Sequence, residues 1–205
     1  NGFTTFATMH PAYILRFPEQ EGAWKADIRQ FAGIVQGKGQ RLTNLVVVDT
    51  PKLFDQMIDD MADEPYVSYD HETTGLYHRK HRVVSWGFGT KHAQYCLPDH
   101  FMRKDRLQCI QEAIADSVKV THTGKFDDLW GTVKHGVTLG LDFDLLIASF
   151  MSNENKRDHG LKSMAVEYLG VENWDVSFDT KTGAGSFDAL VEYQAYDLMY
   201  TRELY

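Results

Sequence analysis

Residues 66–76 read YVSYDHETTGL, an extended apolar run that passes through two acidic residues and ends at a glycine turn. In a strand, side chains two positions apart lie on one face, so Asp70 and Glu72 point to one spot while His71 points away. Two carboxylates this close repel each other unless a positive charge lies between them, and a divalent metal ion is the usual one. Acid pairs at strand ends are also common on solvated surfaces, so this motif alone leaves both interpretations open.

Two later segments contribute further acids. Residues 118–130 predict a short strand, a turn and a helix from about residue 126, with Asp127 in its first turn. The segment 187–200 has no glycine or proline and carries apolar residues at helical spacing. Tyr193 and Asp197 are four positions apart and therefore share one face of that helix. Because Asp128 stands beside Asp127, either of the two can be the third acid.

Three motifs occur in order: Asp-x-Glu-Thr-x-x-Leu at 70–76, Lys-Phe-Asp at 125–127 and Tyr-x-x-x-Asp at 193–197. Together they resemble the DEDDy-type 3′-to-5′ exonucleases, the class of ribonuclease D and of the proofreading domains of family-A DNA polymerases. The resemblance implies four metal-binding acids and a tyrosine that orients the attacking water: Asp70, Glu72, Asp127, Asp197 and Tyr193. It also implies three substrate-binding residues: Thr73, Leu76 and Phe126, with Leu76 as a wedge against the terminal base.

The chemistry of phosphodiester hydrolysis explains why these residue types are needed. Two Mg²⁺ or Mn²⁺ ions about 3.5–4 Å apart hold the attacking water on one side and the leaving 3′-oxygen on the other. We expect Asp70 to bridge both ions, Glu72 and Asp197 to bind the ion on the water side, and Asp127 to support the other. Tyr193 need not act as a base, because its ordinary pKa of about 10 keeps it protonated near neutrality.

One position departs from the family. Its members often carry Asn four positions before the second-motif acid, where this chain has Thr123, which puts a supporting contact in doubt but not the metal site. Four nearby acids are left outside the predicted site: Asp142, Asp144, Asp179 and Asp188. Two of them, Asp144 and Asp188, suit the N-terminal ends of helices.

Composition excludes several classes of protein. No apolar stretch approaches the roughly 18 residues of a membrane span, and no histidine pair has zinc-site spacing. Cys96 and Cys109 are predicted to be reduced thiols, and we expect a cytoplasmic protein of viral or bacterial origin. The net charge of −8 argues against general duplex binding but suits an enzyme that holds a few nucleotides of a single-stranded end. The basic turn at residues 77–82 either steers a phosphate backbone or is merely solvated.

The order of predicted elements indicates the fold. Residues 46–50 start the domain, and a first helix at 51–61 precedes a three-stranded meander at 66–71, 82–90 and 93–98. A helix at 105–116, a strand at 118–121 and helices near 126, 144–152, 160–169 and 187–200 follow, with a loop at 180–185. We expect an α/β domain over residues 42–205, with a ribonuclease H-like mixed sheet flanked by helices.

Residues 1–41 do not belong to this pattern and are predicted to form an N-terminal extension with a linker at 37–40. Residues 1–36 resemble the C-terminal end of the uracil-DNA glycosylase superfamily, through Met9-His10-Pro11 and the apolar stretch that follows. The alternative is a simple turn before a helix. Because the chain ends soon after Asp197, we expect a piece of a longer replication protein.

The leading functional hypothesis is a two-metal-ion 3′-to-5′ exonuclease that acts on single-stranded DNA 3′ ends and proofreads for a covalent or associated polymerase domain. Two alternatives remain: RNA 3′-end trimming of the ribonuclease D kind, and a non-catalytic domain that binds nucleic acid. Recognition of the 2′-hydroxyl depends on contacts that the sequence does not place.

Overall fold

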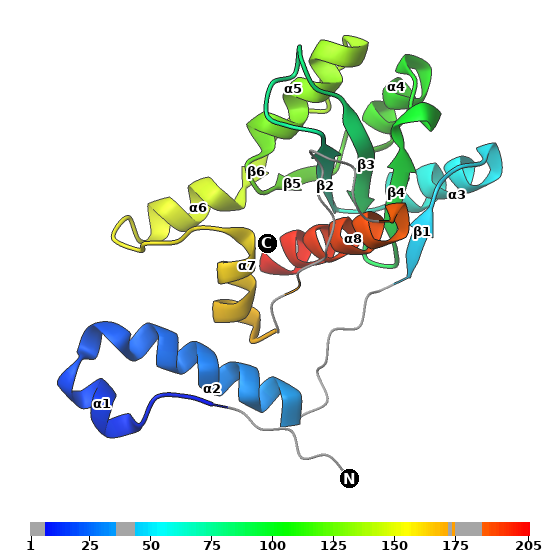
Figure 1. Cartoon of the computed structure of the whole chain (residues 1–205). Coiled ribbons are helices and arrows are strands. Elements are labelled where there is room, and N and C mark those ends of the chain that lie inside the picture. Colours follow the sequence, from blue (N-terminus) through cyan, green and yellow to red (C-terminus); the bar gives the residue numbers. More distant parts are fainter. Residues whose placement is uncertain (1–6, 36–43, 172–173, 175–185) are drawn as a thin grey trace.

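The computed structural model describes residues 7–35, 44–171, 174 and 186–205, and Figure 1 shows the whole chain. Its described part contains one mixed sheet of six strands in the order β1-β4-β3-β2-β5-β6. The strands are β1 (Leu45–Val47), β2 (Tyr66–Thr73), β3 (Val83–Gly89), β4 (Gln94–Pro98), β5 (Val118–Thr121) and β6 (Phe143–Asp144). The helices of the domain are α3 (Pro51–Ala62), η2 (Asp99–Phe101), α4 (Lys104–Ala113), α5 (Gly124–His135), α6 (Leu145–Ser152), α7 (Leu161–Met164), η3 (Ala165–Leu169) and α8 (Phe187–Leu204).

The strand that carries the first motif lies inside the sheet. On one side β2 pairs antiparallel with β3, and on the other it pairs parallel with β5. In the β2–β3 ladder Asp70 lies opposite Gly87 and Glu72 opposite Ser85, and the register shifts just after Glu72. The predicted meander is confirmed, since β3 also pairs antiparallel with β4.

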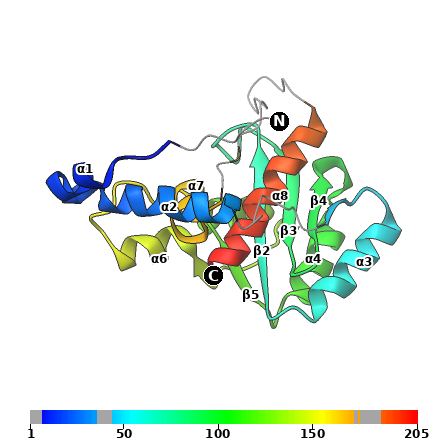
Figure 2. The ribbon, with the colours of Figure 1, turned by 90° about the horizontal axis from the view of Figure 1, so that it is seen from below.

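Helices cover both faces of the sheet (Figures 1 and 2). On one face α3, α4 and α5 pack over the main core, which includes Met57, Ile110 and Trp130. On the other face α8 lies across β2 and β3, where Val191 and Leu198 pack with Cys96 of β4. This layering is the predicted α/β, ribonuclease H-like arrangement.

Glycines let α8 approach the sheet closely. A Cβ added at Gly87 would lie 2.8 Å from the side chain of Gln194, and one at Gly89 would lie 3.2 Å from Leu198 Cβ. Gln194 is fully buried; its Oε1 accepts from Ser85 Oγ at 2.6 Å, and its Nε2 donates to the main-chain oxygen of Asp70 at 2.9 Å. These bonds fix the height of α8 above the strand that carries the first acids.

The N-terminal part consists of α1 (Pro11–Arg16), η1 (Pro18–Gln20) and α2 (Glu21–Val35). His10 caps α1, because its Nδ1 accepts from Ala12 N at 3.1 Å. Helix α2 packs on η3, where Arg29 Nη1 donates to Glu167 O at 2.6 Å. The glycosylase resemblance and the boundary at residue 41 stay predictions, and the predicted linker at 37–40 and loop at 180–185 lie outside the described residues.

Two predicted helices are present but differ in detail. Residues 143–144 pair with β5 as a short strand, so the helix predicted from 144 begins at Leu145. The helix predicted at 160–169 is a short α7 followed by the π-helical η3. Cys96 is buried and Cys109 exposed, and both are free thiols. None of the helices described here is long and apolar enough to span a bilayer; the predicted cytoplasmic location and viral or bacterial origin stay predictions.

Candidate metal centre and active site

Three of the predicted acids converge although two come from β2 and one from α8. One carboxylate oxygen each of Asp70, Glu72 and Asp197 lies within 4.8 Å of the other two. The strand alternation brings the first two to one face, and the close approach of α8 brings the third. Among the described residues this is the one group of three or more such side chains close enough to share an ion.

The donor set fits a hard divalent cation. Asp70 Oδ2 is inaccessible to solvent and has no hydrogen-bond partner among the described residues. A buried carboxylate oxygen without a donor is costly unless a cation satisfies it. Oxygen-only carboxylate ligands are the ones that Mg²⁺ and Mn²⁺ prefer, so the residues present fit the divalent ions expected from the sequence.

The electrostatics of the cluster point the same way. Removal from water raises the pKa of Asp70 to about 6 and, with repulsion from Asp70 added, raises the pKa of Asp197 to about 8. Burial and the charges of Asp70 and Asp197 raise the pKa of Glu72 well above its ordinary value, and Lys162 opposes this shift. A bound cation would offset the repulsion that holds these groups protonated.

Asp127 and Asp128 face different surroundings. Asp127, in the first turn of α5, is 3% exposed, and its Oδ1 accepts a hydrogen bond from His71 N at 3.2 Å. Burial and repulsion from Asp70 raise its carboxyl pKa well above the ordinary range. Asp128 Oδ1 instead accepts from Leu139 N at 2.8 Å and Gly140 N at 3.1 Å. The geometry therefore favours Asp127 as the acid beside the cluster, with Asp128 holding a loop.

Tyr193 lies one helical turn before Asp197 and hydrogen-bonds with its carboxylate. Burial and the charges of Asp197, Glu72 and Asp70 raise its pKa far above the ordinary value, so the hydroxyl is a donor and not a base. The Lys162 ammonium, which the sequence analysis did not single out, lies 4.9 Å from the centre of the Tyr193 ring. No spacing rule links residue 162 to the motifs; only the fold of α7 over α8 brings it here.

The three predicted substrate-binding residues have different environments. Leu76 is 75% exposed in the loop after β2. Thr73 Oγ1 donates to Gly75 O at 3.2 Å within that loop. The Phe126 ring packs on Trp130 with centroids 5.9 Å apart, and its main-chain oxygen contacts His78 Nε2 at 3.0 Å. Leu76 is thus the one of the three whose side chain is largely free to meet a ligand.

The backbone at Thr123 shows what the departure from the family pattern costs. It adopts the left-handed conformation (φ 67°, ψ 33°) directly before α5. Asn tolerates this region far better than a β-branched residue, so the common Asn suits the backbone here. Asp144, left outside the predicted site, stabilises the start of α5 and of α6. Its carboxylate accepts from Thr123 N at 3.2 Å, Gly124 N at 2.9 Å and Leu146 N at 2.9 Å.

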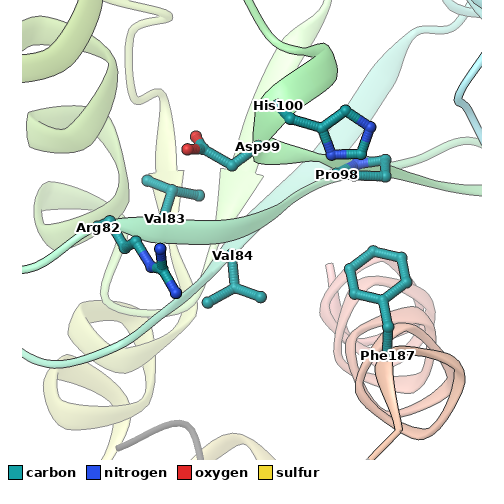
Figure 3. Close-up of a pocket in the computed structure, with 7 residues that line it drawn as sticks. All are labelled: Arg82, Val83, Val84, Pro98, Asp99, His100 and Phe187. Atoms are coloured by element: carbon teal, nitrogen blue, oxygen red, sulfur yellow. The ribbon is translucent and has the colours of Figure 1, made fainter. Parts of the chain in front are cut away.

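A pocket of about 390 Å³ lies beside the start of β3, the end of β4 and the first residue of α8 (Figure 3). It is lined by Arg82, Val83, Val84, Pro98, Asp99, His100 and Phe187. None of the predicted metal ligands or substrate-binding residues is among them. The predicted chemistry therefore lies outside this pocket.

A mixed sheet flanked by helices, with a carboxylate cluster between its central strand and a covering helix, is typical of metal-dependent phosphodiester hydrolases. Residues 45–205 match the 3′-5′ exonuclease family, and the chain belongs to this family. Its activity is accordingly that of a 3′-5′ exonuclease that uses divalent metal ions. The comparison with curated proteins found no match.

Several solved structures share the fold. Brucella melitensis NrnC bound to pGG is 24% identical, with 78% of this chain and 76% of that chain covered and a TM-score of 0.64. The Aedes aegypti Nibbler EXO domain is 14% identical over 81% and 89% of the two chains, with a TM-score of 0.65. Escherichia coli RNase D, described as an exoribonuclease involved in structured RNA processing, is 19% identical over 78% and 44%, with a TM-score of 0.60.

Proposed function

We propose that this chain removes nucleotides from the 3′ end of RNA. The observation that carries the proposal is the convergence of Asp70, Glu72 and Asp197 within 4.8 Å around an unpaired carboxylate oxygen. The proposed metal-binding and water-orienting residues are those of the sequence analysis: Asp70, Glu72, Asp127, Asp197 and Tyr193.

The choice of RNA comes from the structural neighbours. RNase D is described as an exoribonuclease, and NrnC was solved with pGG bound. The expectation of DNA proofreading for a polymerase domain finds no support among these neighbours, so the alternative in the sequence analysis becomes our leading hypothesis. DNA is the competing substrate in the test below.

Each proposed residue has a task that its surroundings permit. When bound, two divalent ions stabilise the charge that develops on the attacking and leaving oxygens. The carboxylates of Asp70, Glu72 and Asp197 fix where a cation sits, and Asp127 completes the set from α5. The protonated Tyr193 hydroxyl donates to Asp197 and has lone pairs free to accept from the attacking water. Leu76, exposed on its loop, packs against the terminal base.

Charge on the loop after β2 supports binding of a nucleic-acid strand. Arg79, Lys80 and Arg82 add three fixed positive charges to a chain whose net charge is −8. Lys134 Nζ donates to His81 O at 2.8 Å and so ties this loop to α5, the helix that carries Asp127. We propose that the loop guides the phosphate backbone toward the carboxylates.

The test uses two 5′-labelled single strands of identical sequence, one RNA and one DNA, incubated with Mg²⁺ or Mn²⁺. We expect a ladder that shortens from the 3′ end, faster on RNA, and no cleavage with EDTA or in Asp70→Asn. Faster cleavage of DNA would overturn the RNA assignment and restore the proofreading hypothesis. A folded protein that binds both strands but cleaves neither would support the non-catalytic alternative.

A further inference from the structure

We propose that Trp174 is a positioning residue of the metal centre: its indole N–H holds the Asp197 carboxylate in the orientation that binds the ion. The inference rests on the proposed role of Asp197 as a metal ligand. Trp174 belongs to none of the motifs, and 23 positions separate it from its partner.

The contact is a direct hydrogen bond. Trp174 Nε1 donates to Asp197 Oδ1 at 2.7 Å, and Trp174 is only 4% exposed. A bond to a charged acceptor away from water is stronger than its solvated counterpart. A carboxylate offers about four lone-pair positions on its two oxygens. The indole therefore fixes the rotation of the group and leaves sites on it free for a cation.

The indole ring is itself held firmly. Tyr200 packs against it with ring centroids 4.6 Å apart, and Tyr196 lies 6.3 Å away, both on α8. The ammonium of Lys162, on α7, lies 5.9 Å from the centre of the Trp174 ring. Aromatic and cationic neighbours on two elements restrict the ring, so the N–H direction is set before a metal ion arrives.

The chemistry of the donor matters as much as its position. An indole N–H is a neutral donor with no acceptor capacity, so it can orient the carboxylate without placing a second positive charge beside the incoming ion. Partners of this kind, which hydrogen-bond to a ligand and not to the metal, change metal affinity or activity by about 10- to 100-fold when removed.

The test is Trp174→Phe in the full chain, which keeps an aromatic ring and removes the N–H. We expect Mn²⁺ binding to weaken about 10- to 100-fold. The binding is measured from the electron paramagnetic resonance signal of the free ion. The Mn²⁺ concentration that gives half-maximal cleavage should rise by a similar factor, with kcat recovering at saturating Mn²⁺. A residue that only packs against the site would not shift the metal-dependence curve.

The control is Trp24→Phe in α2, because the indole N–H of Trp24 is buried without a hydrogen-bond partner among the described residues. Its Mn²⁺ affinity should equal that of the wild type. If Trp174→Phe does not fold, β-(3-benzothienyl)alanine introduced at position 174 keeps the bicyclic shape and replaces only the N–H, with the same expected loss of affinity.

The outcomes separate this inference from the proposed function. Mn²⁺ affinity unchanged in a folded variant that lacks the N–H, beside a wild type that binds Mn²⁺ and cleaves, would overturn the role of Trp174 alone. A wild type that binds no more Mn²⁺ than Asp70→Asn and cleaves nothing would overturn the metal centre itself, and this inference with it.

Discussion

The main-chain N–H of His71 donates a hydrogen bond to the Asp127 carboxylate at 3.2 Å. His71, which lies between the two acids of β2, thus anchors the acid at the start of α5. This hydrogen bond fixes the distance between β2 and the first turn of α5. The ring of His71 lies on the opposite face of the sheet, 4.4 Å from the Trp86 ring. One residue therefore links the carboxylate cluster to the main core.

The roles of Asp127 and Asp128 can be separated by substitution. Asp127→Asn retains an acceptor for His71 N–H, so we expect a folded protein whose cleavage rate falls by more than about 100-fold. Asp128→Ala leaves the N–H groups of Leu139 and Gly140 without their acceptor and should cost about 1–3 kcal/mol while cleavage persists. Urea unfolding and initial rates measure both effects; the reverse pattern would make Asp128 the third acid.

The stability of the metal-free protein should fall as the pH rises. The folded pKa values of about 6 for Asp70 and about 8 for Asp197 exceed the unfolded value of about 4. The folded chain therefore holds more protons than the unfolded chain in this range, so raising the pH destabilises it. We expect the Tm in EDTA to drop from about pH 4 to about pH 8, the range between the unfolded and the folded pKa values.

Bound metal and His71 should each change how Tm depends on pH. Mg²⁺ or Mn²⁺ should make the fall of Tm with pH shallower, because metal binding displaces the carboxyl protons. A pH dependence of Tm that metal leaves unchanged would contradict binding at the cluster. Between about pH 4 and pH 6.5, the ordinary histidine value, His71 contributes in the direction opposite to the carboxyl groups. Burial lowers the pKa of His71 to about 4, so only the unfolded chain binds this proton there. Because several carboxyl groups have raised pKa values, the histidine makes the fall of Tm with pH shallower and does not reverse it.

Gln194 should be needed to hold α8 in place. Gln194→Leu removes its bonds to Ser85 and to the Asp70 main chain, which should cost about 2–4 kcal/mol for buried polar groups left unpaired. Cleavage should also fall, because Tyr193 and Asp197 belong to the same helix and would shift with it. Gln111→Leu, at an exposed position of α4, is the matched control; equal losses of stability in the two variants would contradict this role.

The left-handed backbone at Thr123 predicts a stabilising substitution. Thr123→Asn should raise the free energy of unfolding by about 1 kcal/mol, since Asn adopts this conformation at lower cost. Gly136 ends α5 at φ 67° with open space around an added Cβ, so Gly136→Ala should lower the free energy of unfolding by about 1 kcal/mol through backbone strain alone. Denaturant titration of the pair checks the sign; a destabilised Thr123→Asn would show that the threonine side chain makes a needed contact.

The basic loop predicts a salt-dependent effect on substrate binding. Replacing Arg79, Lys80 and Arg82 with Gln should raise KM, leave kcat near the wild-type value and reduce the salt dependence, by a slope of about 0.7 for each phosphate that the loop no longer neutralises. A variant with Gln at Lys52, Lys91 and Lys104 changes the charge equally on other elements. If both variants shift KM alike, the loop acts only through net charge.

Local sequence determined the elements and most of the proposed site chemistry. The alternation of residues 66–72 brings Asp70 and Glu72 to one face, and the four-residue spacing brings Tyr193 and Asp197 to one side of α8. The sequence also indicated Asp144 as a residue for a helix N-terminus, and its side chain accepts from a main-chain N–H at the start of α6. These features depend on neighbours within one or two turns of the chain.

Only the tertiary structure decided how these pieces meet. Gly87 and Gln194 set the height of α8 over the sheet, the loop at Leu139 and Gly140 engages Asp128, and the fold brings Lys162 and Trp174 to the cluster. Periodicity describes which face a side chain occupies on its own element, whereas contacts between distant residues depend on packing that no local pattern encodes. The sequence by itself therefore determined the acids, and the packing of α7 and α8 against β2 determined which residues surround them.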